Sequence, residues 1–205
     1  MNRFSICIGR QVGSGGKLIG EKLSAQLAIP LYDRELIGIA ARESGMGKTF
    51  FEQADERPRH SFWGGLLGWP SPFAEDWQAN YLSSETLFNI QSDVIRKLAA
   101  QQSCIFVGRC ADYVLASTGH CVAVFICADP ADRLQRIMTA QETTEQKAAD
   151  FIARTDKQRA AYYNFFTGKT WGAAESYHLC INSSLLGIDD AVTRIRDFVE
   201  TITRG

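Results

Sequence analysis

The 205-residue sequence has no CxxC pair, no long apolar run and no excess of charge of either sign. Its six cysteines stand mostly within apolar segments, which favours small buried side chains in a reducing compartment over a disulfide framework or a metal site. No apolar run approaches the roughly 20 residues that a membrane span needs, and the sequence opens without a charged-then-apolar leader. These absences predict a cytoplasmic protein that does not act at a membrane.

The charges nearly cancel, with a net charge of −1 and a sequence pI of about 6.3. A protein with this balance has no global field that would attract nucleic acid or an anionic membrane. Any binding of phosphate must therefore come from local clusters of basic side chains. The length suits one domain with a substantial core, so we expect residues 1–205 to form a single domain.

The most informative stretch is 4–27, in which a short apolar run leads through a glycine-rich turn into an amphipathic segment. The run predicts a buried parallel strand, and the apolar spacing after Gly16 predicts a helix. Such a turn gathers backbone N–H groups and the positive end of the helix dipole, an arrangement that binds phosphate. A glycine-rich turn without a ligand is the alternative. The predicted phosphate-binding residues are Arg10, Gly13, Ser14, Gly15, Gly16 and Lys17.

This turn departs from the phosphate-loop pattern GxxxxGK followed by Ser or Thr. Counted back from Lys17, the first glycine of the pattern falls on Gln11, and the residue after the lysine is Leu18. Alignment on 13–15 instead puts Gly16 where the lysine belongs and Lys17 where the magnesium-binding hydroxyl belongs. Either way one chemical group is missing. Three residues are candidates to replace it: Arg10, Ser14 and Lys17.

Strand and helix patterns alternate along the chain, which predicts an α/β fold with a parallel sheet and helices on both faces. The strands are expected at 4–8, 28–32, 104–107, 122–127 and 178–181. An arginine just past the carboxyl end of such a strand points to where ligands lie in these sheets, so Arg109 is the strongest side-chain candidate, with a structural ion pair as the alternative. Asp112, one turn onward, would orient it. Asp33 is either the N-cap of the helix after the second strand or a ligand-binding residue, and the two roles are compatible.

Two further groups of basic residues lie in predicted helices. Arg133 and Arg136 share one helix face at i, i+3 spacing. Arg154 and Arg159, with Lys157 between them, form a basic cluster in the helix predicted over 142–163. Solvated surface side chains are the alternative for both groups.

The segment 57–80 holds three of the four tryptophans and three of the five prolines, without a clean period. It is too aromatic for a disordered linker and too broken for a helix. A lid near the acceptor site, an oligomer contact such as that of a homodimer, and plain loop packing all fit this composition.

Several stretches resemble the cytidylate kinase-like family: 8–37, IFVGRCADYVL at 105–115, VFICADPADRLQRIM at 124–138, TDKQRAAYYNFFTGKTWG at 155–172 and YHLCINSSLLGIDDAV at 177–192. The resemblance implies a three-layer P-loop NTPase fold with a five-stranded parallel sheet and a helical lid at about 140–172. It implies ATP with Mg2+ as donor and an acceptor such as CMP or dCMP.

The resemblance also implies roles for individual residues. Asp33 and Arg34 would border the monophosphate site together with Arg109 and Asp112, and Arg133 and Arg136 would contact the base and phosphates of ATP. The catalytic candidates are Lys17, Arg154 and Arg159, which would stabilise the transferring phosphoryl group. A nucleotide-binding sensor that has lost transfer chemistry, and a kinase for another small acceptor, are the alternatives.

Overall fold

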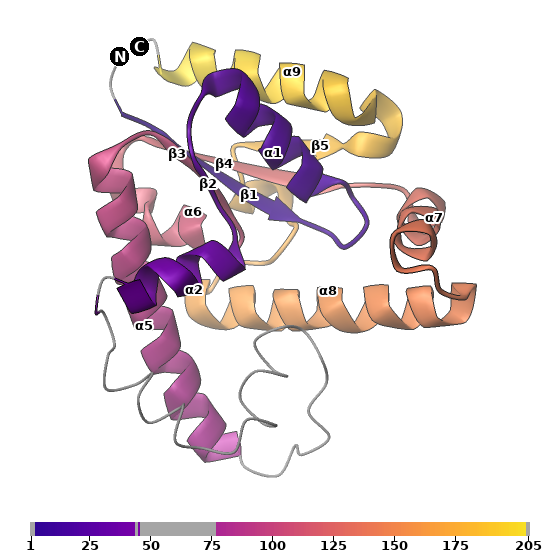
Figure 1. Cartoon of the computed structure of the whole chain (residues 1–205), viewed down its shortest axis with the longest axis horizontal. Helices are drawn as coiled ribbons and strands as arrows, with labels where there is room; N and C mark the ends of the chain where they lie inside the picture. Colours follow the sequence, from indigo (N-terminus) through magenta and orange to yellow (C-terminus); the bar gives the residue numbers. More distant parts are fainter. Residues whose placement is uncertain (1–2, 44, 46–76, 204–205) are drawn as a thin grey trace.

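The computed structural model describes residues 3–43, 45 and 77–203, so residues 57–76 of the aromatic segment lie outside the described part. Five parallel strands form one sheet in the order β2-β3-β1-β4-β5 (Figure 1). The strands are β1 Ser5–Arg10, β2 Leu31–Tyr32, β3 Cys104–Val107, β4 Cys121–Cys127 and β5 Leu179–Asn182. All five predicted strands are present, and β1 runs two residues further than expected, to Arg10.

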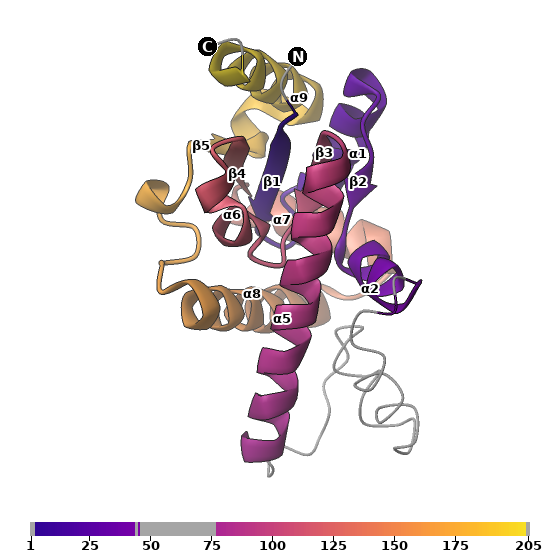
Figure 2. The same ribbon diagram turned by 90° about the vertical axis from the view of Figure 1, so that its left-hand side faces the viewer.

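Helices cover both faces of the sheet. Helices α1 Gly16–Leu27 and α9 Ser183–Thr203 lie side by side on one face (Figure 1). The other face carries α5 Trp77–Gln101, the short α6 Ala111–Val114 and α8 Glu145–Thr167, and Figure 2 shows α5 crossing α8. Helix α2 Arg34–Glu43 packs on α5, and α7 Pro130–Gln141 on α8. Short 3-10 turns, η1 Ala116–Thr118 and η2 Ala174–Ser176, complete the described elements.

Side chains of β1 enter a different core on each side of the sheet because they alternate along the strand. Ile6 and Ile8 pack with α1 and α9, whereas Cys7 packs with α5 and α6. A third cluster, which includes Phe125 and Tyr163, joins β4 to α8. The predicted pattern of apolar residues on both faces of the central strands is therefore confirmed.

The helices differ from the sequence prediction in two places. Helix α5 begins at Trp77, inside the segment 57–80 that was interpreted as too broken for a helix, and α6 was not predicted. Helix α9 begins at Ser183 directly after β5 and contains a non-helical residue at Gly187 (φ 76°). None of the described helices is long and apolar enough to cross a bilayer.

Candidate active site

Three residues predicted to bind ligand, and a fourth that was not predicted, lie at the carboxyl ends of strands. Arg10 ends β1, Asp33 follows β2, Arg109 lies two residues past β3, and Ser183 follows β5. Because all the strands are parallel, these positions meet at one edge of the sheet, which is the ligand-binding edge of open α/β sheets.

The backbone of the glycine-rich loop is held by its carbonyl groups. Arg133 Nε donates to the carbonyl of Val12 (2.7 Å), Arg136 Nη1 to that of Gly13 (3.1 Å) and Ser183 Oγ to that of Ser14 (2.7 Å). A peptide whose carbonyl is held in this way directs its N–H to the opposite side. The first N–H groups of α1 also have no acceptor within the helix. The Ser14 N–H donates to the Gln11 carbonyl at 3.4 Å, so the donors suited to an anion are the N–H groups of Gly13, Gly15 and the first turn of α1.

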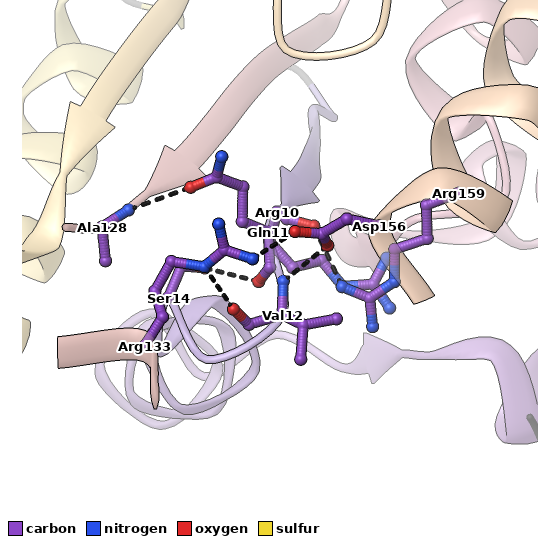
Figure 3. A network of polar contacts seen from close by, with 8 residues as sticks. All are labelled: Arg10, Gln11, Val12, Ser14, Ala128, Arg133, Asp156 and Arg159. Atoms are coloured by element: carbon purple, nitrogen blue, oxygen red, sulfur yellow. Dashed lines mark hydrogen bonds and ion pairs between the residues drawn. The ribbon is translucent and has the colours of Figure 1, made fainter. Parts of the chain in front are cut away.

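A carboxylate of α8 fastens this loop to two elements at once (Figure 3). Asp156 Oδ1 accepts the Val12 N–H at 2.9 Å, and Asp156 Oδ2 pairs with the Arg133 guanidinium. The Arg133 side chain is 11% exposed. The surface alternative for Arg133 is therefore wrong: this arginine is buried and holds the loop through both Val12 and Asp156.

Guanidinium groups gather beside the loop. Arg159 Nη1 donates to the Arg10 carbonyl at 3.1 Å (Figure 3). Burial lowers the pKa of Arg159, and the nearby charges of Arg109 and Arg133 lower it further, while Asp156 acts in the opposite direction. A site in which cations repel one another is stabilised by an anionic ligand, so this edge of the sheet is electrostatically prepared for phosphate.

Arg109 lies in a strained turn. Gly108, Arg109 and Cys110 have φ values of 82°, 60° and 54°, all in the left-handed region. A non-glycine residue held there costs about 1–3 kcal/mol, and such residues cluster at ligand-binding sites. The Arg109 guanidinium carbon lies 5.4 Å from the centre of the Tyr162 ring, within the range of a cation–π contact. The turn and the ring together fix the direction of this side chain.

Asp112 was expected to orient Arg109, but the structure gives its carboxylate a different partner. The Tyr163 hydroxyl donates to Asp112 Oδ2 at 2.7 Å. Burial raises the pKa of Asp112, although the Tyr163 hydrogen bond and the charge of Lys169 lower it in part. Asp112 thus ties α6 to α8, and the Tyr162 ring takes the place beside Arg109.

The raised pKa of Asp112 predicts that the fold loses stability as the pH rises. In the unfolded chain the Asp112 carboxyl group loses its proton at the ordinary aspartate pKa of about 3.9, whereas in the folded chain it does so only at a higher pH. Stability from Asp112 is therefore fully present below about pH 3.9 and is lost as the pH rises through the folded pKa. Asp112→Asn, which stays neutral and still accepts from Tyr163, should melt above the wild type at pH 7, with the difference shrinking towards pH 4. Asp93→Asn, at an exposed aspartate, is the control; a constant difference across pH would contradict this explanation.

Lys17 and Asp33 form an ion pair across the start of α1. The Lys17 ammonium lies 3.2 Å from Asp33 Oδ2, and the Lys17 side chain is 64% exposed. The Leu36 N–H donates to Asp33 Oδ1 at 3.2 Å, so the predicted N-cap role of Asp33 is confirmed. A lysine predicted to contact the donor and an aspartate predicted to contact the acceptor are thus joined to each other.

Two predicted residues are not brought to the loop by any described contact. Arg154 is exposed, and because 3.6 residues make one helical turn it lies on the side of α8 opposite Asp156 and Arg159. Arg34 begins α2, and its side chain lies outside the described part of the chain.

Sequence reasoning missed two residues that shape the site, Asp156 and Ser183. One signal was available for Asp156. Asp156, Arg159 and Tyr163 are spaced i, i+3, i+7, which places them on one face of a helix, whereas Arg154 falls on another.

Comparisons with known proteins agree with this architecture. A model of the cytidylate kinase-like family matches residues 5–185. The solved structure of an uncharacterized protein from Eubacterium ventriosum ATCC 27560 is 26% identical, with a TM-score of 0.74, and the match covers 97% of this chain and 99% of that chain. A search of curated proteins found no match.

More distant solved structures share the fold. A shikimate kinase from Bacteroides thetaiotaomicron has a TM-score of 0.51 at 16% identity, covering 96% of this chain and 98% of that chain. A gluconokinase from Sinorhizobium meliloti 1021 has a TM-score of 0.54 at 13% identity, covering 98% of each chain. The chain therefore has the three-layer α/β fold of P-loop kinases, as the sequence predicted.

Proposed function

Because this chain belongs to the cytidylate kinase-like family, we propose that it is an ATP-dependent phosphotransferase whose acceptor is a nucleoside monophosphate, with CMP and dCMP as the first acceptors to test. One observation carries the proposal. Arginines from three separate elements, Arg10, Arg109 and Arg159, surround a loop that offers its backbone N–H groups to an anion.

The residues divide into three tasks. The loop and the start of α1 hold the donor phosphates, and Arg133 and Arg136 fix the loop from behind. Arg109 holds the acceptor phosphate, and Arg159 faces the phosphoryl group in transit. An acceptor phosphate oxygen bonds to the terminal phosphorus of ATP as the bond to the ADP oxygen breaks, so no protein nucleophile is needed.

The described residues do not provide a magnesium site of their own. Among them, no group of three His, Cys, Asp or Glu side chains could hold a metal, and Lys17 stands where the pattern has a hydroxyl ligand. Magnesium commonly keeps several waters and binds substrate phosphates directly. In our proposal it enters with ATP, and none of the tasks above depends on it.

A nucleotide sensor without transfer activity is the second candidate. The observation that favours it is the Lys17–Asp33 ion pair: the loop lysine is bound to a carboxylate and largely exposed, and not directed at a phosphate-binding position. A kinase for another small acceptor is the third, because the P-loop kinases that share the fold include proteins named for shikimate and gluconate.

A screen of ADP formation separates these candidates. The purified chain is incubated with ATP and Mg2+ and with each common nucleoside monophosphate in turn, then with shikimate and with gluconate. We expect acceptor-dependent ADP formation with a pyrimidine monophosphate. ATP binding, seen as a raised melting temperature, without turnover for any acceptor would support the sensor. No binding of any nucleotide at millimolar concentration would overturn both.

A further inference from the structure

The loop cation is missing from its usual place because another side chain fills that space. Helix α1 begins at Gly16, the position that corresponds to the phosphate-loop lysine when the pattern is aligned on 13–15. A Cβ atom added to Gly16 would lie 2.6 Å from Arg10 Cβ and 3.0 Å from Arg10 Cγ. Real Cβ atoms essentially never come within 3.0 Å of another atom in this way. Gly16 therefore cannot carry a side chain while Arg10 keeps its present position.

The Arg10 side chain runs from the loop towards the acceptor side of the site. Its guanidinium lies against Gly108, where a Cβ would be 3.2 Å from Arg10 Cζ and closer still to Nη1. Gly108 precedes Arg109 in the strained turn after β3. The charge of Arg10 is thus placed between the loop that would hold the donor and the arginine that would hold the acceptor.

The backbone of Arg10 is fixed in this position. Arg10 is the last residue of β1, paired in register with Ile126 of β4, and its carbonyl accepts from Arg159 Nη1 (Figure 3). From this fixed point its side chain runs past Gly16 to Gly108. A planar guanidinium with several donors suits the bidentate binding of phosphate oxygens.

The two other candidates for the missing group are engaged elsewhere. Ser14 is fully buried, and its Oγ donates to the Gln11 carbonyl at 2.9 Å. Lys17 is paired with Asp33 and is 64% exposed. Of the three residues that the sequence left open, Arg10 is selected by its position, because its Cβ and Cγ fill the space that a side chain at position 16 would need.

We propose that Arg10 and Gly16 form an exchanged pair, in which an arginine at the first position of the phosphate loop replaces the lysine at its seventh and binds the terminal phosphates of a nucleotide. This inference rests on the proposed function for the identity of the ligand. It reverses the sequence expectation for Lys17, because the side chain with access to the phosphates comes from β1 and not from α1.

A double-mutant cycle tests the exchange with two readouts, the affinity for ADP with Mg2+ by calorimetry and the melting temperature without ligand. Arg10→Gly should weaken ADP binding by about tenfold to a hundredfold, as expected for a lost charge-assisted contact. Gly16→Lys should lower the melting temperature by about 2–8 °C, because two side chains then share one space. Arg10→Gly combined with Gly16→Lys restores the GxxxxGK part of the pattern, with Lys17 unchanged after it, and should recover both readouts.

Further variants keep the test decisive if Gly16→Lys does not fold. Arg10→Lys preserves a charge and should keep more ADP affinity than Arg10→Gly. Lys17→Ala removes the rival cation and should weaken ADP less than Arg10→Gly does; Arg96→Ala, at an exposed arginine of α5, is the neutral control. A larger loss at Lys17 than at Arg10, or a melting temperature for Gly16→Lys that does not depend on residue 10, would overturn the exchange. A wild type that binds no nucleotide would instead overturn the proposed function.

Discussion

The Asp156→Ala variant should lose about 3–5 kcal/mol of unfolding free energy, the range measured when one partner of a buried ion pair is removed. Asp156 and Arg133 have side chains only 16% and 11% exposed, and the same carboxylate accepts the Val12 N–H. The substitution leaves the Val12 N–H without its acceptor and removes the charge partner of the buried Arg133 guanidinium, which keeps its hydrogen bond to the Val12 carbonyl. Both losses fall on the phosphate-binding loop.

Urea denaturation followed by circular dichroism measures this effect, and the melting temperature should fall by about 6–20 °C for a chain of this size. Asp156→Asn keeps an acceptor for Val12 and should lose less. Asp150→Ala is the matched control, since Asp150 lies exposed on the same helix and accepts only from Gln146 among the described contacts. A loss at Asp156 no larger than that at Asp150 would show that α8 does not hold the loop.

Arg109→Ala should lower kcat/KM for the acceptor by about 10²–10³, while the affinity for ATP stays close to that of the wild type. Arg109 follows β3 at the ligand-binding edge, and the described structure gives it the Tyr162 ring as its contact and no ion pair. An arginine held by a ring face keeps its donors for a ligand. The strained turn makes its orientation independent of that ligand.

The strain provides an internal control for this variant. Arg109→Gly removes the same charge but suits a φ of 60°, so it should lose the same acceptor affinity and be more stable than Arg109→Ala by about 1 kcal/mol. Steady-state kinetics, with calorimetric binding of the acceptor, measures the first effect and thermal melting the second. Unchanged acceptor affinity in both variants would make Arg109 a purely structural residue.

The sheet could be predicted from the sequence because central parallel strands are buried on both faces and read as continuous apolar runs. The position of Arg109 followed from the same rule, since a residue after such a strand lies at the ligand-binding edge. Neither step needs a distance between residues that are far apart in the sequence.

The contacts of the site could not be predicted, because they join residues that are far apart in the sequence. Asp156 and Val12 are 144 positions apart, and only the packing of α8 across the strand ends brings them together. The burial of Arg133 likewise depends on α7 lying against the loop. Comparison with the phosphate-loop pattern shows that a lysine is missing at Gly16. Which residue replaces it, Arg10 or Lys17, depends on which side chain fills the space beside that glycine, and this requires the structure.

The contact between Arg10 and Gly16 also restricts the order in which the two positions can change in evolution. Lysine at 16 and arginine at 10 would compete for one space, because a Cβ at 16 lies 2.6 Å from Arg10 Cβ. A lineage that changes one residue at a time between the two kinds of loop must therefore pass through glycine at both positions. That intermediate would bind phosphate through its backbone N–H groups alone, with a lower affinity for nucleotide. Selection for binding then separates the two kinds of loop, and related sequences should carry arginine with glycine or glycine with lysine at these positions, but seldom a mixture.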